Sequence, residues 1–240
     1  MTFSSEVTVW SHLRHPNILP LIGVVQQERT LCFVSPYLSH GNIRMYLGNN
    51  PGANRSFLAV DVAQALDFLH SLEPPIVHTD IKGDNILVSD AERACLIDFG
   101  FSTAKDTLQV HVTSTMESAR STPWTAPEIL NGDTTGHHSY TLKSDMYAFG
   151  GVCYELFCGK IPFFGCADGT IIFRIMTGQN PDRINTRYVD DGVWSFIEEC
   201  WNKEPTERPT AHQAVEFFNF QASDAGEIDI RPAMEWDYSA

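Results

Sequence analysis

Two short polar segments, each placed after an apolar stretch, constrain the fold of this chain more than any other feature. Residues 78–85 read His-Thr-Asp-Ile-Lys-Gly-Asp-Asn and lie between two predicted strands. Asp98-Phe99-Gly100 directly follows the apolar residues 95–97. The turn-prone sequence Ser-Asp-Ala-Glu-Arg joins residues 86–88 to residues 95–97, which indicates a pair of short strands. Because both polar segments follow short strands, both can lie at the mouth of one cleft.

Helical patterns dominate the chain after about residue 55. Apolar residues recur there on one face of a long amphipathic helix: Leu58, Val62, Ala65, Leu66 and Leu69. Pro74-Pro75 ends this helix, and residues 102–123, rich in Ser, Thr and charge, predict an exposed loop. Further helices are predicted over 2–13, 141–158, 167–177, 192–202 and 210–219. The apolar residues 18–26 and 30–36 predict a hairpin near the N-terminus. A strand-bearing start followed by a helical body places the chain in the α+β class.

The residue types in the two polar segments suit phosphoryl transfer from ATP. That reaction needs a carboxylate that orients the attacking hydroxyl, a cation that neutralises charge, and oxygen ligands for Mg²⁺. Asp80 can be the base and Lys82 the cation, while Asn85 and Asp98 can be the magnesium ligands. Gly100 lets the backbone turn sharply after Asp98. Taken alone, Asp80 or Asn85 is more typical of a turn or a helix cap, and a strand that ends in Asp-Phe-Gly is often just a turn. The argument therefore depends on their joint order.

That joint order resembles the signature motifs of protein kinases. The motifs are His-x-Asp-x-Lys-x-x-Asn at 78–85, Asp-Phe-Gly at 98–100 and Ala-Pro-Glu at 126–128. The resemblance implies a protein-kinase-like fold with a mostly helical C-terminal lobe and an incomplete N-terminal lobe. The kinase domain would cover residues 1–218, with 1–36 the remnant of the small lobe and 37–218 the large lobe. Residues 219–240 would be an acidic C-terminal tail.

The resemblance also implies a role for each candidate site residue. Asp80, Lys82 and Asn85 would be catalytic, and Asn85 and Asp98 would bind Mg²⁺ and, through it, ATP. Lys82, two residues after the catalytic aspartate, favours serine and threonine as acceptors. Trp124-x-Ala-Pro-Glu and Cys-Trp-Asn-Lys-Glu-Pro-Thr-Glu-Arg-Pro-Thr at 200–210 resemble the tyrosine-kinase-like branch of serine/threonine kinases. The implied function is transfer of the ATP γ-phosphoryl group to serine/threonine hydroxyls, with ATP and a protein substrate as partners.

For the nucleotide, the resemblance points to the segment after the second strand of the hairpin. Ser35 would be the gatekeeper, and backbone groups of Pro36 and Leu38 would bond the adenine edge. Leu87 would lie beneath the adenine ring. Glu6 would pair with the ATP-binding lysine of the family, although it is equally typical of a solvated helix residue.

Outside the nucleotide site, the resemblance implies several contacts that hold the lobes and loops together. Asp145 would brace the backbone of residues 78–85, or it is an ordinary charge at a helix N-terminus. Ser121 would contact Asp80 and Lys82. Glu128 would pair with Arg208, although each is also an unremarkable surface type. A hydrophobic column would link the lobes through four residues: Trp10, Leu21, His78 and Phe99.

The sequence departs from the family pattern in three places, one of which, Gly83-Asp84 in the loop, is permissive and leaves the candidate catalytic residues in place. It has no glycine-rich phosphate loop, and its first lysine is Lys82, so the ATP-binding lysine has no counterpart. We therefore expect an N-terminally shortened kinase, and a pseudokinase or scaffold is the alternative function. Thr79 stands where most family members carry arginine, so it cannot clamp a phosphorylated activation loop. A small-molecule kinase is less consistent with residues 121–128, which resemble a protein-docking segment.

Charge and cysteine content narrow the partners and the compartment. Lys and Arg total 16 and Asp and Glu total 30, so the formal net charge is −14. That charge argues against broad binding to nucleic acid or to an anionic membrane. No segment approaches a membrane span of about 18 apolar residues. The six cysteines form no Cys-x-x-Cys pair, which favours a reducing compartment and a cytoplasmic location. The oligomeric state is not indicated.

Overall fold

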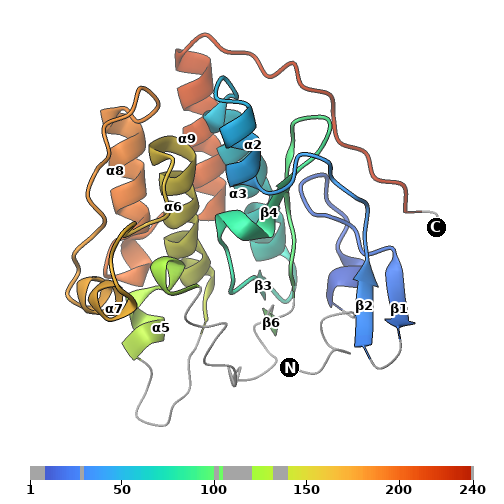
Figure 1. The fold of residues 1–240 in the computed structure, drawn as a ribbon, viewed down its shortest axis with the longest axis horizontal. Helices are drawn as coiled ribbons and strands as arrows, with labels where there is room; N and C mark the ends of the chain where they lie inside the picture. Colours follow the sequence, from blue (N-terminus) through green and yellow to red (C-terminus); the bar gives the residue numbers. More distant parts are fainter. Residues whose placement is uncertain (1–8, 28–29, 100–102, 105–120, 132–139, 239–240) are drawn as a thin grey trace.

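The computed structural model describes residues 9–27, 30–99, 103–104, 121–131 and 140–238 (Figure 1). A helical body carries most of these residues, and a two-stranded hairpin lies to one side of it. The helices of the body are α2 (Ile43–Asn49), α3 (Arg55–Ser71), α5 (Pro127–Asn131), α6 (Leu142–Cys158), α7 (Asp168–Met176), α8 (Asp191–Cys200) and α9 (Ala211–Asp224). The expected α+β class with a mostly helical body is confirmed.

Helix α6 is the centre of the core. Residues 144–158 are all buried, which agrees with the buried helix predicted over 141–158. Thr141 caps its N-terminus in a reciprocal capping box with Ser144. Gly159 ends it in the left-handed conformation with φ 73°, which glycine adopts without a side-chain penalty. The predicted limits of this helix, 141–158, are therefore accurate to one residue.

Three antiparallel strand pairs are described. They are β1 (Gly23–Gln27) with β2 (Thr30–Val34), β3 (Ile76–Val77) with β6 (Thr103–Ala104), and β4 (Ile86–Val88) with β5 (Ala94–Leu96). The hairpin β1–β2 and the pair β4–β5 confirm the predicted strands. Strand β6 lies inside the range predicted as loop, where two residues pair with Ile76 and Val77. Of the other residues in that prediction, 102 and 105–120 are outside the described residues. Thr122 and Pro123 belong to a short buried 3-10 helix, Thr122–Trp124, so the prediction of an exposed loop is wrong at these positions.

The segment before the hairpin attaches it to the helical body. Ile18, predicted to begin a strand, instead makes a parallel bridge to Leu96, and the Leu19 N–H donates to the Leu96 carbonyl at 3.0 Å. Trp10, on the short helical segment 9–12, lies 5.4 Å from the Phe33 ring and 5.8 Å from the Phe99 ring. The hairpin and the body therefore share one hydrophobic core.

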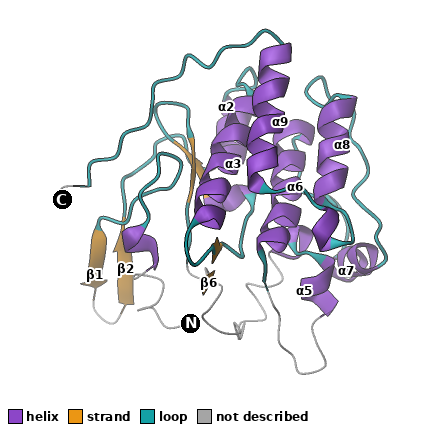
Figure 2. Ribbon diagram, turned by 180° about the vertical axis from the view of Figure 1, so that it is seen from behind, coloured by secondary structure: helices purple, strands orange, loops and turns teal. Residues whose placement is uncertain are grey.

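The C-terminal segment differs from the expected tail. Helix α9 continues to Asp224, five residues beyond the predicted end at 219, and packs along α3. Residues 225–238 have no regular secondary structure. They run back across the body to the side that carries β1 and β2 (Figure 2). No helix in the described part of the chain is both long enough and apolar enough to cross a bilayer.

His15 lies in the same attachment segment and makes the fold sensitive to acid. Its half-buried ring stacks on Phe68 at 5.0 Å, and its Nδ1 accepts a hydrogen bond from the Asn17 N–H at 3.1 Å. Burial lowers the pKa of His15 from 6.5 to about 4, which the charge of Asp67 partly offsets. Between these two pH values, the unfolded chain binds a proton here that the folded chain does not. The contribution of His15 to stability is therefore complete above pH 6.5 and is lost as the pH falls towards 4.

We expect this loss to be about 2 kcal/mol, because partial exposure of the ring screens part of the shift. The matched variant is His15→Asn, whose amide oxygen can accept the same hydrogen bond but does not titrate. Urea denaturation of both proteins from pH 7 to pH 4 measures the difference in pH dependence. Equal slopes of unfolding free energy against pH would contradict the prediction.

Candidate functional site

The side chains of Lys82, Asn85 and Ser121 converge on the carboxylate of Asp80. Lys82 Nζ and Asn85 Nδ2 donate to Asp80 Oδ2 at 2.6 and 2.8 Å. Ser121 Oγ donates to Asp80 Oδ1 at 2.8 Å, and it accepts from Lys82 Nζ at 2.9 Å. The two oxygens of Asp80 are thus fixed by three partners, and the lysine balances the negative charge. The predicted proximity of Ser121 to Asp80 and Lys82 is confirmed.

The backbone of this loop is held by a buried carboxylate from α6. Asp145 is 1% exposed, and its two oxygens accept from the N–H groups of His78 and Thr79 at 2.8 and 2.9 Å. His70 Nε2 lies 3.1 Å from Asp145 Oδ2. Thr79 has a φ of 75°, a costly conformation for a branched residue, and the bond from its N–H helps to hold it. Asp145 therefore braces the loop, and the alternative of an ordinary helix-terminal charge is wrong.

Asp98 is the first residue of the Asp-Phe-Gly motif and lies two residues after the end of β5. Hydrogen bonds of the preceding residue, Ile97, place it beside the loop 78–85. The Ile97 N–H donates to the Asn85 carbonyl at 3.0 Å, and the Ile97 carbonyl lies 3.0 Å from His78 Nε2. Phe99 is fully buried, with its ring 5.0 Å from the His78 ring. These contacts bring Asp98 and Asn85 to adjoining ends of β4 and β5, as the sequence predicts.

Three members of the expected hydrophobic column are in contact through their rings: Trp10, Phe99 and His78. Phe99 contacts both Trp10 and His78 through its ring, and Leu21 packs against the same core cluster. Because Trp10 belongs to the N-terminal part and His78 to the large body, the column connects the two parts behind Asp98.

Two of the residues predicted to line the nucleotide site, Leu38 and Leu87, lie close to each other. Leu38 and Leu87 belong to one small hydrophobic cluster, together with Leu19 and Cys95. The Val88 N–H donates to the Gly41 carbonyl at 3.0 Å, which ties the segment after Leu38 to β4. Ser35 and Pro36 directly follow β2 and are half-buried. Glu6 lies outside the described residues.

The site also contains a second cluster of charged side chains, which was not predicted from the sequence. Glu155 of α6 is 2% exposed, and its Oε1 accepts from the Gly83 N–H at 2.9 Å and from Trp124 Nε1 at 2.8 Å. Its Oε2 pairs with Arg44 Nη1 at 3.2 Å, and Arg44 also pairs with Asp84. Burial raises the pKa of Glu155 to about 7, against the opposing effect of Arg44. The signal in the sequence is a glutamate inside an otherwise apolar helix, because a buried charge needs partners.

This cluster also explains the glycine at position 83. A Cβ on Gly83 would lie 2.3 Å from Glu155 Oε2, so a side chain there would displace the carboxylate. Glu155 thus connects the loop that carries Asp80 with Trp124, three residues after Ser121.

The predicted pair between Glu128 and Arg208 is confirmed. Arg208 Nη1 and Nη2 donate to Glu128 Oε1 and Oε2 at 2.7 and 2.8 Å, a bidentate arrangement. The Arg208 side chain is fully buried, whereas that of Glu128 is 27% exposed. The pair fixes α5 against the segment that precedes α9.

The atoms at the site that can coordinate a cation are oxygens. Asn85 Nδ2 donates to both the carbonyl and Oδ2 of Asp80 at 2.8 Å, which leaves Asn85 Oδ1 as its donor atom for a metal. With the Asp98 carboxylate, this set suits Mg²⁺, which keeps several waters and takes one or two carboxylates. Among the described residues, no group of three or more His, Cys, Asp or Glu side chains could hold a metal ion.

Comparisons with known proteins agree with this geometry. Residues 1–218 match the family model described as protein tyrosine and serine/threonine kinase. The chain is 33% identical to serine/threonine-protein kinase CTR1 of Arabidopsis thaliana over 220 residues, which cover 87% of this chain and 25% of CTR1. It is 30% identical to serine/threonine/tyrosine-protein kinase HT1 of the same plant over 212 residues, covering 86% of this chain and 51% of HT1.

A similar match comes from Acanthamoeba polyphaga mimivirus. Its protein R831, named as a serine/threonine-protein kinase/receptor, is 33% identical over 221 residues, which cover 90% of this chain. The chain spans only 13% of the length of R831. The similarity therefore concerns one domain of these longer relatives.

Proposed function

Because the chain belongs to the protein tyrosine and serine/threonine kinase family, we propose that it transfers the γ-phosphoryl group of ATP to serine or threonine hydroxyls of protein substrates. The observation that carries the proposal is the hydrogen-bonded cluster of Asp80, Lys82, Asn85 and Ser121. In this proposal residues 1–36 belong to the small lobe of the kinase domain and residues 37–218 form the large lobe.

In this proposal the protein side chains orient the acceptor and balance charge. Asp80 accepts the proton of the attacking hydroxyl, for which one carboxylate oxygen must exchange its present partner for substrate. Lys82 Nζ, 2.6 Å from Asp80 Oδ2, neutralises charge on the transferred group. Ser121 holds the segment that docks the substrate against these two residues.

ATP and Mg²⁺ are the proposed cofactors. Asn85 and Asp98 would hold the metal, which supplies positive charge to the phosphate oxygens when bound. Ser35 would be the gatekeeper, and backbone groups of Pro36 and Leu38 would bind the adenine edge. Pro36 offers a carbonyl but no N–H. Leu87 would form the floor, and Glu6 would pair with the ATP-binding lysine of the family.

A pseudokinase or scaffold is the second candidate function. This alternative concerns the 240 residues as given: none of residues 1–81 is a lysine, whereas the family pattern places the ATP-binding lysine in a small-lobe strand. Loss of one preorganised charge typically lowers the rate of an enzyme by about 10²–10³-fold. The two candidates therefore differ in whether residual transfer is measurable.

The test combines nucleotide binding with transfer on the 240-residue chain. At Mg²⁺-ATP ten times its Kd, we expect the Tm to rise by about 3–6 °C. Asp98→Asn should remove most of that rise, because it deletes the carboxylate ligand. Under excess enzyme, transfer of labelled phosphate to a protein substrate should exceed the Asp80→Asn background. If the protein showed no Tm shift and no phosphate transfer at millimolar Mg²⁺-ATP, the kinase proposal would be refuted and the scaffold function favoured.

A cytoplasmic location is also a proposal. All six cysteines are free thiols in the described part of the chain, which supports a reducing compartment. The net charge of −14 supports protein partners over nucleic acid or an anionic membrane.

A further inference from the structure

The segment 227–238, here called the strap, is fastened to the body at two separated places. It leaves the end of α9 and runs to the side that carries the hairpin (Figure 2). On the way Arg231 bonds to Asp61 of α3, and Trp236 then bonds to Pro16, which precedes the hairpin. The first fastening is a cluster of charged side chains around Asp61. The second is the packing of the Trp236 side chain against a small hydrophobic cluster near the hairpin. The region between the two fastenings has no regular secondary structure, so these side chains determine its path.

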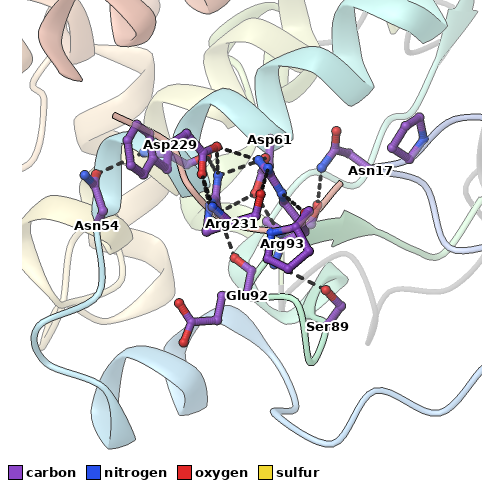
Figure 3. Close-up of polar contacts among 12 residues, drawn as sticks. Asn17, Asn54, Asp61, Ser89, Glu92, Arg93, Asp229 and Arg231 are labelled. Carbon is purple, nitrogen blue, oxygen red and sulfur yellow. Dashed lines mark hydrogen bonds and ion pairs between the residues drawn. The ribbon is translucent and has the colours of Figure 1, made fainter. Parts of the chain in front are cut away.

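The first fastening is built around a carboxylate inside the protein. Asp61, on α3, is fully buried, and its Oδ2 accepts from Arg231 Nη1 at 2.8 Å and from the Ala94 N–H at 2.9 Å (Figure 3). Its Oδ1 lies 3.3 Å from both Arg231 Nη2 and Arg93 Nη1. A buried carboxylate without cationic partners is costly. Arg231 of the strap thus supplies the nearest cationic partner to this buried carboxylate.

The strap itself completes the cluster. Asp229 Oδ2 pairs with Arg93 Nη1 at 2.6 Å and with Arg231 Nη2 at 2.9 Å. Arg93 also donates to the carbonyls of Arg231 and Pro232 at 2.9 and 3.0 Å. Two carboxylates and two guanidinium groups therefore balance, and the body and the strap each contribute one of each.

The second fastening reaches the proposed nucleotide site. Trp236 packs against the cluster of Leu19, Leu38 and Cys95, against which Leu87 also packs. Its Nε1 donates to the Pro16 carbonyl at 3.0 Å. Residues 35–38, here called the linker, connect β2 to the body, and the backbone of Leu38 is proposed to bind the adenine edge. Leu87 is proposed to lie beneath the adenine ring, so Trp236 shares a hydrophobic cluster with two residues of the proposed adenine site. Two residues later, the Arg14 guanidinium lies 4.3 Å from the centre of the Tyr238 ring.

We propose that Trp236 is a positioning residue for nucleotide binding, held in place by the Arg231–Asp61 anchor. The inference rests on the proposed kinase function. Trp236 acts through Leu38: it fixes the linker 35–38 relative to β4 and β5, so that the adenine-binding groups are ordered before ATP arrives. In the described part of the chain, no hydrogen bond or ion pair joins residues 80–85 to the strap, so we expect the phosphoryl-transfer step itself to be unaffected.

The test compares Trp236→Ala, Trp236→Phe and a matched surface control, Phe173→Ala, on the 240-residue chain. Phe173 is 62% exposed on α7. We expect Trp236→Ala to raise the Kd and KM for Mg²⁺-ATP by about tenfold. Its kcat and its KM for protein substrate should change little. Trp236→Phe should recover part of the affinity, and Phe173→Ala should bind like the wild type.

Hydrogen exchange of the linker amides gives a readout that needs no nucleotide. Trp236→Ala should exchange faster at residues 35, 37 and 38, whereas α6 should exchange at the wild-type rate. If the Arg231→Gln variant folds, its linker amides should also exchange faster while α6 exchanges at the wild-type rate. If this variant does not fold, the exchange of Trp236→Ala alone tests the proposal. Unchanged linker exchange, or faster exchange with unchanged ATP affinity, would overturn the proposal. Wild-type protein that fails to bind Mg²⁺-ATP would instead refute the proposed function, while linker exchange still tests the strap.

Discussion

Asp80→Asn is expected to lower the rate constant for phosphoryl transfer by about 10²–10⁴-fold, the range for loss of a positioned general base. The asparagine amide is close in size to the carboxylate but cannot accept a proton from the substrate hydroxyl. It also puts an amide where Lys82 Nζ and Ser121 Oγ now donate at 2.6 and 2.8 Å. Mg²⁺-ATP binding should change little, because the proposed metal ligands Asn85 and Asp98 remain. Single-turnover transfer of labelled phosphate measures the rate.

Asp182→Asn is the matched control for this experiment. It makes the same change of charge at a side chain that is 90% exposed, so it should transfer phosphate at the wild-type rate. Nucleotide affinity from thermal shift should be equal in all three proteins. If Asp80→Asn transferred phosphate at the wild-type rate, Asp80 would not be the base.

The local chemistry of the site was accessible from the sequence because it depends on residues close together in the chain. Asp80, Lys82 and Asn85 lie within six positions of one another, so one loop conformation brings them together. Ser121 and Asp145 are distant in sequence, and their contacts with this loop were expected only through resemblance to the family. The structure brings both to the predicted places.

Glu155 and Arg44 show where sequence reasoning stops. A glutamate in an apolar helix signals a buried charge, but the signal does not identify a partner on another helix. Arg44 lies 111 positions away along the chain, and only the packing of α2 near α6 brings the two together. Their contacts with Asp84 and Gly83 follow from that packing.

The C-terminal segment shows a different limitation. Asp61 precedes Val62 on a helix with one predicted apolar face. From the residue type alone, the Asp61 side chain is expected to be exposed to solvent. In the structure, residues 58–63 of α3 are all buried, since α9 and the strap cover further sides of the helix. Acidic composition predicted a tail, but pairing of Asp229 with arginines of the body and of the strap turns that segment into part of the fold.

Glu128→Gln is expected to lower the free energy of unfolding by about 3 kcal/mol, the lower end for breaking a buried ion pair. The lower end applies because the Glu128 side chain is 27% exposed and water screens part of its charge. The substitution preserves size but leaves the fully buried Arg208 guanidinium without a counter-charge. Arg208 retains hydrogen bonds to the carbonyls of Asn202 and Lys143 at 2.8 and 2.9 Å, which satisfy some N–H groups but not the charge.

A double-mutant cycle separates loss of the pair from loss of packing. Arg208→Met removes the buried charge while retaining a long apolar side chain, and adding Glu128→Gln to it should cost under about 1 kcal/mol more. Urea denaturation of the four proteins gives the coupling energy. If Glu128→Gln cost the same with and without Arg208, the bidentate contact would contribute nothing specific to stability. A large coupling would mean that this pair secures α5, and with it the segment through which Ser121 reaches Asp80.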